Sequence, residues 1–303
     1  DLLGNLEIAP GKSLTSDSTV LIVHGTLAHH RMEIIVALQS ALRSRGINSL
    51  AVTLGLGLDH RKGMFDCSLE HDHRHTDAVE EIEAWVEWLT AKGAKRIALA
   101  GHSRGGHQAA LFVVEKSAQP IGRLILLAPL VNDADEVAAQ YVKVHKRDLS
   151  SVREKAKQIL DGGEGDLLME KVGFLSCPDA KVTAAAFLDY YAAEPQHALG
   201  ELLKKIERPV LLITGSSDDL VPDLAARMRQ AKLPPSVEIA TVAGADHFFR
   251  DLFIEDVALL RHDQCAQRIL RDAPRPAEFD GFDDRTSRTF GRFGSLLRSF
   301  ERL

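Results

Sequence analysis

The chain has 303 residues, of which 45% are hydrophobic and 26% charged, and its formal net charge is −6 with the histidines neutral. This composition is typical of a soluble globular protein and excludes wholesale disorder, and the modest negative charge argues against binding to nucleic acid. The longest clear apolar run, at residues 124–131, is far shorter than the roughly 18 residues that a membrane-spanning helix needs. We therefore expect no nucleic-acid partner and no transmembrane segment.

Strand and helix patterns alternate along the chain from residue 19 onward. Short apolar runs predict strands that are buried on both faces of a sheet, at residues 19–24, 48–54, 96–100, 124–128, 209–215 and 237–242. Apolar residues at helical spacing predict helices at residues 31–44, 76–93 and 103–116. This order predicts an α/β fold, with a mostly parallel central sheet flanked by helices.

The alternation breaks between Leu130 and Arg208. This stretch has several helical patterns, an acidic turn at residues 161–165 and no convincing strand. An insertion in an α/β domain predicts a helical cap, here at about residues 131–208, over the carboxyl edge of the sheet, where ligands bind in such folds. We therefore expect one domain at residues 1–271 that includes its cap.

A separate tail follows at residues 272–303. Residues 272–285 are rich in Pro, Asp and Arg, which is typical of a linker or surface strap. Beyond them, an apolar stripe at helical spacing is formed by Phe290, Phe293, Leu296, Leu297 and Phe300. This stripe predicts an amphipathic helix that either docks on its own domain or lies on a membrane or partner.

The sequence Gly101-His102-Ser103-Arg104-Gly105 matches the G-x-S-x-G pattern of a serine nucleophile. A predicted strand ends just before it and a predicted helix begins at the serine. A nucleophile on such a sharp turn sits in strained backbone, and the flanking glycines avoid collisions with neighbouring elements. The helix N-terminus would also place backbone N–H groups near a developing oxyanion. We therefore predict Ser103 as the nucleophile.

A serine hydroxyl needs a base, and the base needs an acid that orients it. With this elbow, the acid and then the base follow the serine along the chain. Asp218 and Asp219 follow the predicted strand at residues 209–215, and His247 follows the last predicted strand. We assign Asp218 as the acid and His247 as the base, with Asp219 as the alternative acid.

The oxyanion donors and substrate contacts are expected beside these residues. Gly25 allows the loop after the first predicted strand to turn a backbone donor toward the serine. We predict the backbone N–H groups of Thr26 and Arg104 as the donors, with Leu27 as the alternative to Thr26. The candidate substrate-contacting residues are Leu27, His102, Phe248 and Tyr190, although packing is an equal alternative for Tyr190.

Together with His24-Gly25, Val221-Pro222 and Gly244, these motifs resemble the α/β-hydrolase fold superfamily of serine hydrolases, over residues 19–271. The resemblance implies an eight-stranded, mostly parallel sheet, a cap between strands six and seven, and hydrolysis through an acyl-enzyme without a metal or organic cofactor. The early loop departs from the family pattern because it lacks a second glycine. A serine at the elbow disfavours the branches that use aspartate there, epoxide hydrolases and haloalkane dehalogenases, and the dienelactone-type branch, which uses cysteine.

The predicted function is hydrolysis of an ester-like bond, either a carboxylic ester, a thioester or a lactone, in a small-molecule substrate. Carbon–carbon bond hydrolysis and perhydrolysis remain open as well. The alternative from a different class is a ligand receptor of the same fold, with slow or no turnover. The sequence does not define the oligomeric state.

Three cysteines, Cys67, Cys177 and Cys265, lie far apart, which excludes zinc-ribbon and thioredoxin-type motifs. Pairing of Cys67 with Cys177 depends on export of the protein. The chain begins at Asp1 without Met, as expected of a removed signal peptide or of a shortened chain, so cytoplasmic and exported locations both stay open.

His71, His73 and His75 alternate, and in an extended segment they would share one face, as metal ligands can. No second group with metal-ligand spacing accompanies them. We therefore expect a polar loop leading into the next helix, with a metal site as the alternative.

Overall fold

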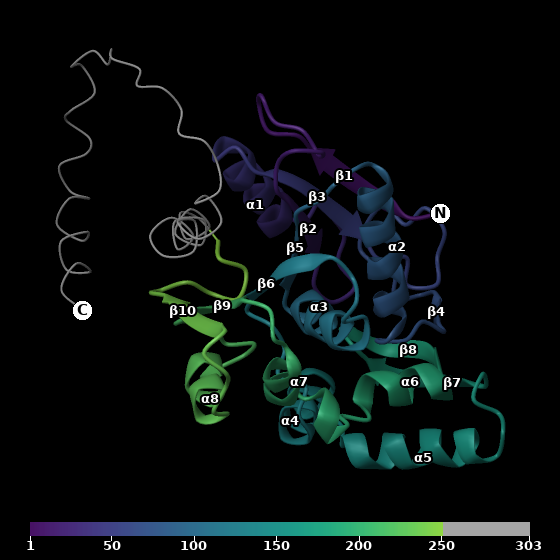
Figure 1. The fold of residues 1–303 in the computed structure, drawn as a ribbon. Helices are drawn as coiled ribbons and strands as arrows, with labels where there is room; N and C mark the ends of the chain where they lie inside the picture. The colour runs from purple at the N-terminus through teal and green to yellow at the C-terminus, as the bar shows by residue number, and fades with distance from the viewer. Residues whose placement is uncertain (251–303) are drawn as a thin grey trace, which may run out of the picture. The chain divides into compact units, whose positions relative to one another are not determined.

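The computed structural model describes residues 1–250. The predicted strap, the predicted amphipathic helix and Cys265 lie outside the described residues. In residues 1–250, a central sheet carries helices on both faces, and a smaller three-stranded sheet lies beside it (Figure 1). This part of the chain contains no helix that is long and apolar enough to cross a bilayer.

The central sheet has seven strands in the order β1-β3-β2-β5-β6-β9-β10. All neighbours pair in parallel except β1, which pairs with β3 in the antiparallel sense. The strands are β1 (Leu3–Glu7), β2 (Thr19–Val23), β3 (Asn48–Thr53), β5 (Ile97–His102), β6 (Ile121–Leu127), β9 (Val210–Gly215) and β10 (Val237–Val242). The predicted mostly parallel sheet is therefore confirmed. The implied count of eight strands is wrong for the described residues, because a single strand, β1, precedes β2.

Inner strands such as β2, β3 and β9 could be recognised because both of their faces are buried. In β2, Leu21 and Val23 join the core that also holds α2 (Asp77–Ala91) and α3 (Arg104–Glu115). The alternate residues of β2 face the opposite way, into a second core with α1 (Glu33–Ser44). Successive side chains of a strand point to opposite faces, so burial of both faces requires an unbroken apolar run.

The segment between β6 and β9 contains both helices and strands. Its elements are α4 (Ala134–His145), α5 (Leu149–Asp161), β7 (Leu168–Phe174), β8 (Cys177–Thr183), α6 (Ala184–Tyr191), the 3₁₀ turn η1 (Pro195–His197) and α7 (Leu199–Lys205). Strand β7 pairs antiparallel with β8, and the short strand β4 (Glu70–His71) joins β8 in parallel. The expectation of an insertion without strands is therefore wrong. The insertion also follows the fifth strand of the central sheet rather than the sixth, since the described residues contain one N-terminal strand fewer than the resemblance implies.

Two features hid the strand β7 from sequence analysis. Lys171 has a positive φ of 55°, and the pairing register shifts between Met169 and Val172. Such a bulge places an extra residue in one strand and breaks the two-residue alternation by which strands are recognised.

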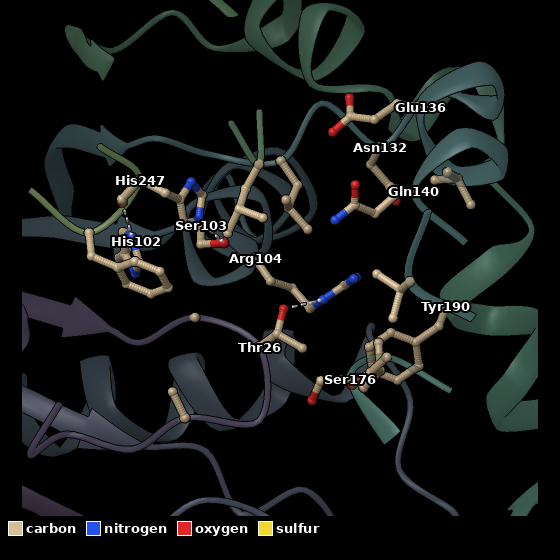
Figure 2. A pocket seen from close by; sticks show the side chains of 18 of the residues that line it. Thr26, His102, Ser103, Arg104, Asn132, Glu136, Gln140, Ser176, Tyr190 and His247 are labelled. Carbon is tan, nitrogen blue, oxygen red and sulfur yellow. Dashed lines mark hydrogen bonds between the residues drawn. The ribbon is translucent and has the colours of Figure 1, made fainter. Parts of the chain in front are cut away.

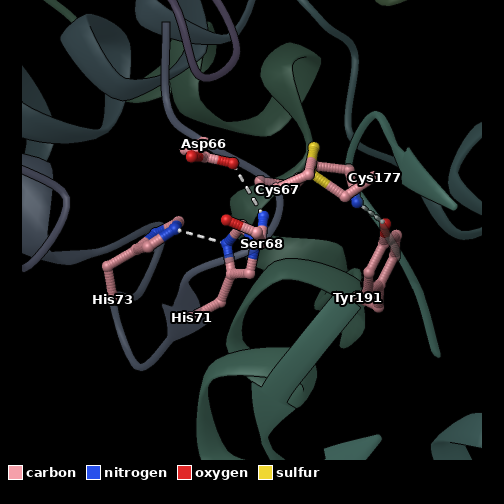
Figure 3. Close-up of a disulfide and its surroundings, with 8 residues drawn as sticks. Asp66, Cys67, Ser68, His71, His73, Cys177 and Tyr191 are labelled. Carbon is pink, nitrogen blue, oxygen red and sulfur yellow. Dashed lines mark hydrogen bonds between the residues drawn. A yellow bond between two sulfur atoms is a disulfide. The ribbon is translucent and has the colours of Figure 1, made fainter. Parts of the chain in front are cut away.

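A disulfide ties this insertion to the loop that follows β3. Cys67 and Cys177 are bonded with their Cα atoms 5.4 Å apart, although 110 positions separate them in the sequence (Figure 3). Beside it, the hydroxyl of Tyr191 accepts a hydrogen bond from the backbone N–H of Leu175 at 2.7 Å. The pairing that sequence analysis left open is thus present in the structure.

Candidate active site

Ser103 lies on the sharp turn between β5 and α3. Its backbone has φ 55° and ψ −123°, which is a strained conformation for any residue other than glycine. The turn is held by a hydrogen bond of 2.9 Å from the Ser103 N–H to the carbonyl oxygen of Leu127. A Cβ atom at Gly105 would collide with the backbone carbonyl of His24, so only glycine permits α3 to start this close to β2. The strain is thus imposed by tight packing on the neighbouring strands.

Hydrogen bonds join Ser103, His247 and Asp218 in a row. His247 Nε2 lies 2.9 Å from Ser103 Oγ (Figure 2), and His247 Nδ1 lies 2.8 Å from Asp218 Oδ2. All three residues are less than 10% exposed, at 7%, 3% and 8% respectively. Because Nδ1 faces a carboxylate, it carries the proton and donates to Asp218. Nε2 is then free to accept the hydrogen bond from the serine hydroxyl.

Asp218, and not Asp219, contacts the imidazole. Its other oxygen, Oδ1, accepts hydrogen bonds of 2.9 Å from the backbone N–H groups of Leu220 and Val221. Desolvation alone would raise the pKa of Asp218, but the hydrogen bonds from His247 and these N–H groups outweigh it, and the pKa lies below its ordinary value. Asp219 is exposed. The carboxylate beside His247 is therefore ionised at neutral pH.

Two buried histidines hold the loops around this row. His102 Nε2 donates to the carbonyl oxygen of His247 at 2.9 Å. His24 Nδ1 donates to the carbonyl oxygen of Gly25 at 2.8 Å, and its Nε2 accepts from the N–H of Leu54 at 3.0 Å. Burial lowers the pKa of each of these two histidines to about 3, so both rings are neutral.

Sequence analysis missed these positioning roles of His24 and His102. The only signal for either residue is its place at the carboxyl end of a buried strand, next to a glycine or to the serine. That signal marks a residue near the site, but it does not identify which backbone carbonyl the ring reaches.

A cavity of about 420 Å³ opens at Ser103. Three of the candidate substrate-contacting residues, His102, Phe248 and Tyr190, line it, as does Thr26. Leu27 does not, because its side chain is buried in the core on the β2 side, and its selection as a substrate contact is therefore wrong. The insertion supplies a large part of the wall, through Asn132, Glu136, Val137, Gln140, Tyr141, Val144, Leu175, Ser176 and Tyr190.

The two predicted oxyanion residues lie next to each other at this cavity. Arg104 is the first residue of α3, where a backbone N–H has no acceptor within the helix. Its side-chain Nε donates to Thr26 Oγ1 at 3.1 Å, which links the α3 terminus to the loop after β2 (Figure 2).

His73 and His75 lie in the loop that leads into α2, as expected, and all three alternating histidines are buried. His71 Nδ1 lies 3.1 Å from His73 Nε2, and His73 Nδ1 lies 3.0 Å from the Tyr190 hydroxyl of the insertion. His75 Nε2 lies 2.9 Å from Nδ1 of His107 on α3. Residues 1–250 contain no group of three or more His, Cys, Asp or Glu side chains arranged to hold a metal ion. These histidines thus join the loop before α2 to the insertion, through Tyr190, and to α3, through His107.

Comparisons with known proteins identify the fold. A model of the alpha/beta hydrolase family matches residues 20–262. The bifunctional esterase/perhydrolase DCH of Acinetobacter calcoaceticus is 26% identical over 203 residues, which are 58% of this chain and 68% of that protein. The structure of Est1E from Butyrivibrio proteoclasticus with ferulic acid has a TM-score of 0.64 and 19% identity, over 88% of this chain and 96% of Est1E. The monoacylglycerol lipase of Paleococcus ferrophilus has a TM-score of 0.58 and 17% identity, over 86% of this chain and 98% of the lipase.

Proposed function

Because the chain belongs to the alpha/beta hydrolase family, we propose that it is a serine hydrolase that cleaves an ester-like bond through an acyl-enzyme. The observation that carries the proposal is the buried row of hydrogen bonds from Ser103 to His247 to Asp218. The names of the relatives, an esterase/perhydrolase and a lipase among them, support a hydrolase of esters.

In the first half of the proposed reaction, Ser103 Oγ attacks the carbonyl carbon of the substrate while His247 Nε2 takes the hydroxyl proton. Asp218 stabilises the resulting imidazolium. The oxyanion accepts hydrogen bonds from the backbone N–H groups of Thr26 and Arg104, where the N-terminal end of α3 also contributes a positive potential. His247 returns the proton to the leaving oxygen or sulfur, and the acyl group stays on Ser103.

In the second half, His247 removes a proton from a water molecule, which attacks the acyl carbon. The second tetrahedral intermediate collapses with return of the proton to Ser103, and the carboxylic acid leaves. Every proton transfer uses the same imidazole nitrogen, so the neutral tautomer fixed by Asp218 is required at the start of both halves.

The test is labelling with a fluorophosphonate probe together with turnover of short acyl esters. We expect the protein to be labelled, and Ser103→Ala to lose both the label and at least a thousandfold in kcat. Ser44→Ala, at an exposed serine on α1, is the matched control and should keep both. Tight ester binding without multiple turnovers would instead favour a receptor, and labelling of Ser103→Ala would overturn the nucleophile assignment.

A further inference from the structure

The side chain of Arg104 extends from the start of α3 into the cavity at Ser103, toward Tyr190 of the insertion (Figure 2). The proposed oxyanion role uses only the backbone N–H of this residue. Its guanidinium, an obligatory cation, therefore has no part in the proposed bond-breaking steps.

Within residues 1–250, the guanidinium of Arg104 has no carboxylate partner. Its one hydrogen bond runs from Nε to Thr26 Oγ1 at 3.1 Å, and its Cζ lies 5.1 Å from the ring centre of Tyr190. The two Nη groups, which carry four of the five N–H donors, make no hydrogen bond to any described residue. Arg104 is only partly buried, so these free donors face the cavity, where an anionic ligand can pair with them.

The acidic side chain in the wall of this cavity pairs with a different cation. Glu136 lines the same cavity, but its Oε2 lies 3.0 Å from Nη1 of Arg227. The same guanidinium of Arg227 also binds Asp133 at 2.6 Å. Among the described residues, Arg104 therefore has no carboxylate in direct contact, and Glu136 acts on it only at longer range.

The remaining wall is mostly apolar, with neutral amide or hydroxyl groups at Asn132, Gln140 and Ser176. Leu130, Val137, Val144, Leu175 and Leu220 provide much of the apolar surface. Such a cavity suits a ligand with an apolar body and one negative group, and a guanidinium binds a carboxylate through two parallel hydrogen bonds.

We propose that Arg104 binds a free carboxylate of the substrate, so that the preferred substrates are hemiesters, meaning esters whose acyl part ends in a second, ionised carboxyl group. This inference rests on the proposed serine hydrolase function. Ser103 and the Arg104 side chain line the same cavity, so one substrate molecule can reach both, and the length of its spacer is what the test below varies.

The test compares the para-nitrophenyl hemiester of glutaric acid with its ω-amide, which has the same shape and no charge, and repeats the pair with shorter and longer diacids. We expect the wild-type kcat/KM to favour the hemiester by roughly 10- to 100-fold for at least one spacer length. Arg104→Gln should bring this ratio close to one, and Arg104→Lys should retain part of it. Lys116→Gln, which removes one positive charge beyond the far end of the same helix, should keep the wild-type ratio.

A measurement on the wild type alone covers the case in which Arg104→Gln does not fold. The free dicarboxylate should inhibit hydrolysis of a neutral ester at least tenfold more strongly than the corresponding diamide. Hydrolysis of neutral esters with no preference for any hemiester, or a preference that persists in Arg104→Gln, would overturn this inference and leave the proposed function standing. Failure to hydrolyse any ester would instead overturn the proposed function.

Discussion

The ring of His102 reaches across the site to the backbone of His247, with its Nε2 2.9 Å from the carbonyl oxygen. The residue before the proposed nucleophile thus holds the loop that carries the proposed base. Because His102 is neutral and buried, this hydrogen bond fixes position without adding a charge next to His247.

We expect His102→Phe to lower kcat about 10- to 100-fold, since a displaced base reaches the serine hydroxyl less often in the productive geometry. KM for a neutral ester should change much less. His102→Gln, which can still donate a hydrogen bond, should recover part of the lost rate. Steady-state kinetics on both variants tests this, and equal losses in the two would contradict a role through the hydrogen bond.

The two neighbouring aspartates allow a matched comparison. Asp218→Asn should lower kcat/KM by about 10⁴, because an amide can stabilise the wrong tautomer of His247. Asp219→Asn removes the same charge from an exposed position and should stay within about threefold of the wild type. Kinetics on one ester substrate is sufficient, and a larger loss in Asp219→Asn would reverse the assignment.

Gly105 is expected to be intolerant of any side chain. Gly105→Ala would drive its Cβ into the carbonyl of His24, and we expect about 3 kcal/mol less free energy of unfolding. Gly122→Ala is the control, because a Cβ there meets no described atom closer than the carbonyl oxygen of Ile97 at 3.7 Å. Urea unfolding of both variants measures the difference, and equal stability would show that α3 can move away from β2.

The disulfide closes a long loop and should contribute substantially to stability. Replacing both cysteines, as Cys67→Ser with Cys177→Ala, should lower the free energy of unfolding by about 2–5 kcal/mol. The wild type with a reductant should show a loss of similar size, while the reductant should not affect the double variant. A double variant as stable as the oxidised wild type would contradict this expectation.

Buried histidines predict a loss of stability in mild acid. Burial lowers the pKa of His24, His73 and His102 to about 3, and that of His71 and His107 to about 4. In the unfolded chain these rings take up protons below about pH 6.5, whereas in the folded protein they do not. The free energy of unfolding should therefore be highest above about pH 7 and fall as the pH decreases toward 4.

Each such ring contributes up to about 1.4 kcal/mol per pH unit in that window. Urea unfolding at several pH values between 7.5 and 4.5 measures the slope. His71→Phe keeps an aromatic ring in place and removes one titrating group. The dependence of its unfolding free energy on pH should therefore be weaker by the contribution of one proton, up to about 1.4 kcal/mol per pH unit. A free energy of unfolding that stays constant down to pH 5 would contradict the burial of these rings.

The sequence predicts the inner strands of the central sheet well because they are buried on both faces and leave an unbroken apolar pattern, whereas the more exposed β1 has no such pattern and is not predicted. Ser103, Asp218 and His247 can likewise be selected from the sequence, because each of them follows a predicted strand within a few residues. The structure brings these three residues together because the carboxyl ends of parallel strands meet at one edge of the sheet.

Features that depend on distant contacts could not be predicted in this way. The burial of His73 depends on Tyr190, 117 positions away in the sequence, and that of His75 on α3. Strand β7 was missed because its bulge at Lys171 breaks the alternation. The direction of the Arg104 side chain also depends on distant contacts, with Thr26 and Tyr190. The sequence places Arg104 only at the start of a helix.

The disulfide between Cys67 and Cys177 also determines how the insertion can move relative to the sheet. Cys177 directly follows Ser176, which lines the cavity, so this side of the wall is covalently anchored. On the opposite side, α4 is held to α8 (Leu224–Gln230) by the ion pairs of Arg227 with Asp133 and Glu136. One side of the cavity wall is therefore attached by a covalent bond and the other by ion pairs, and only the ion pairs are weakened by added salt.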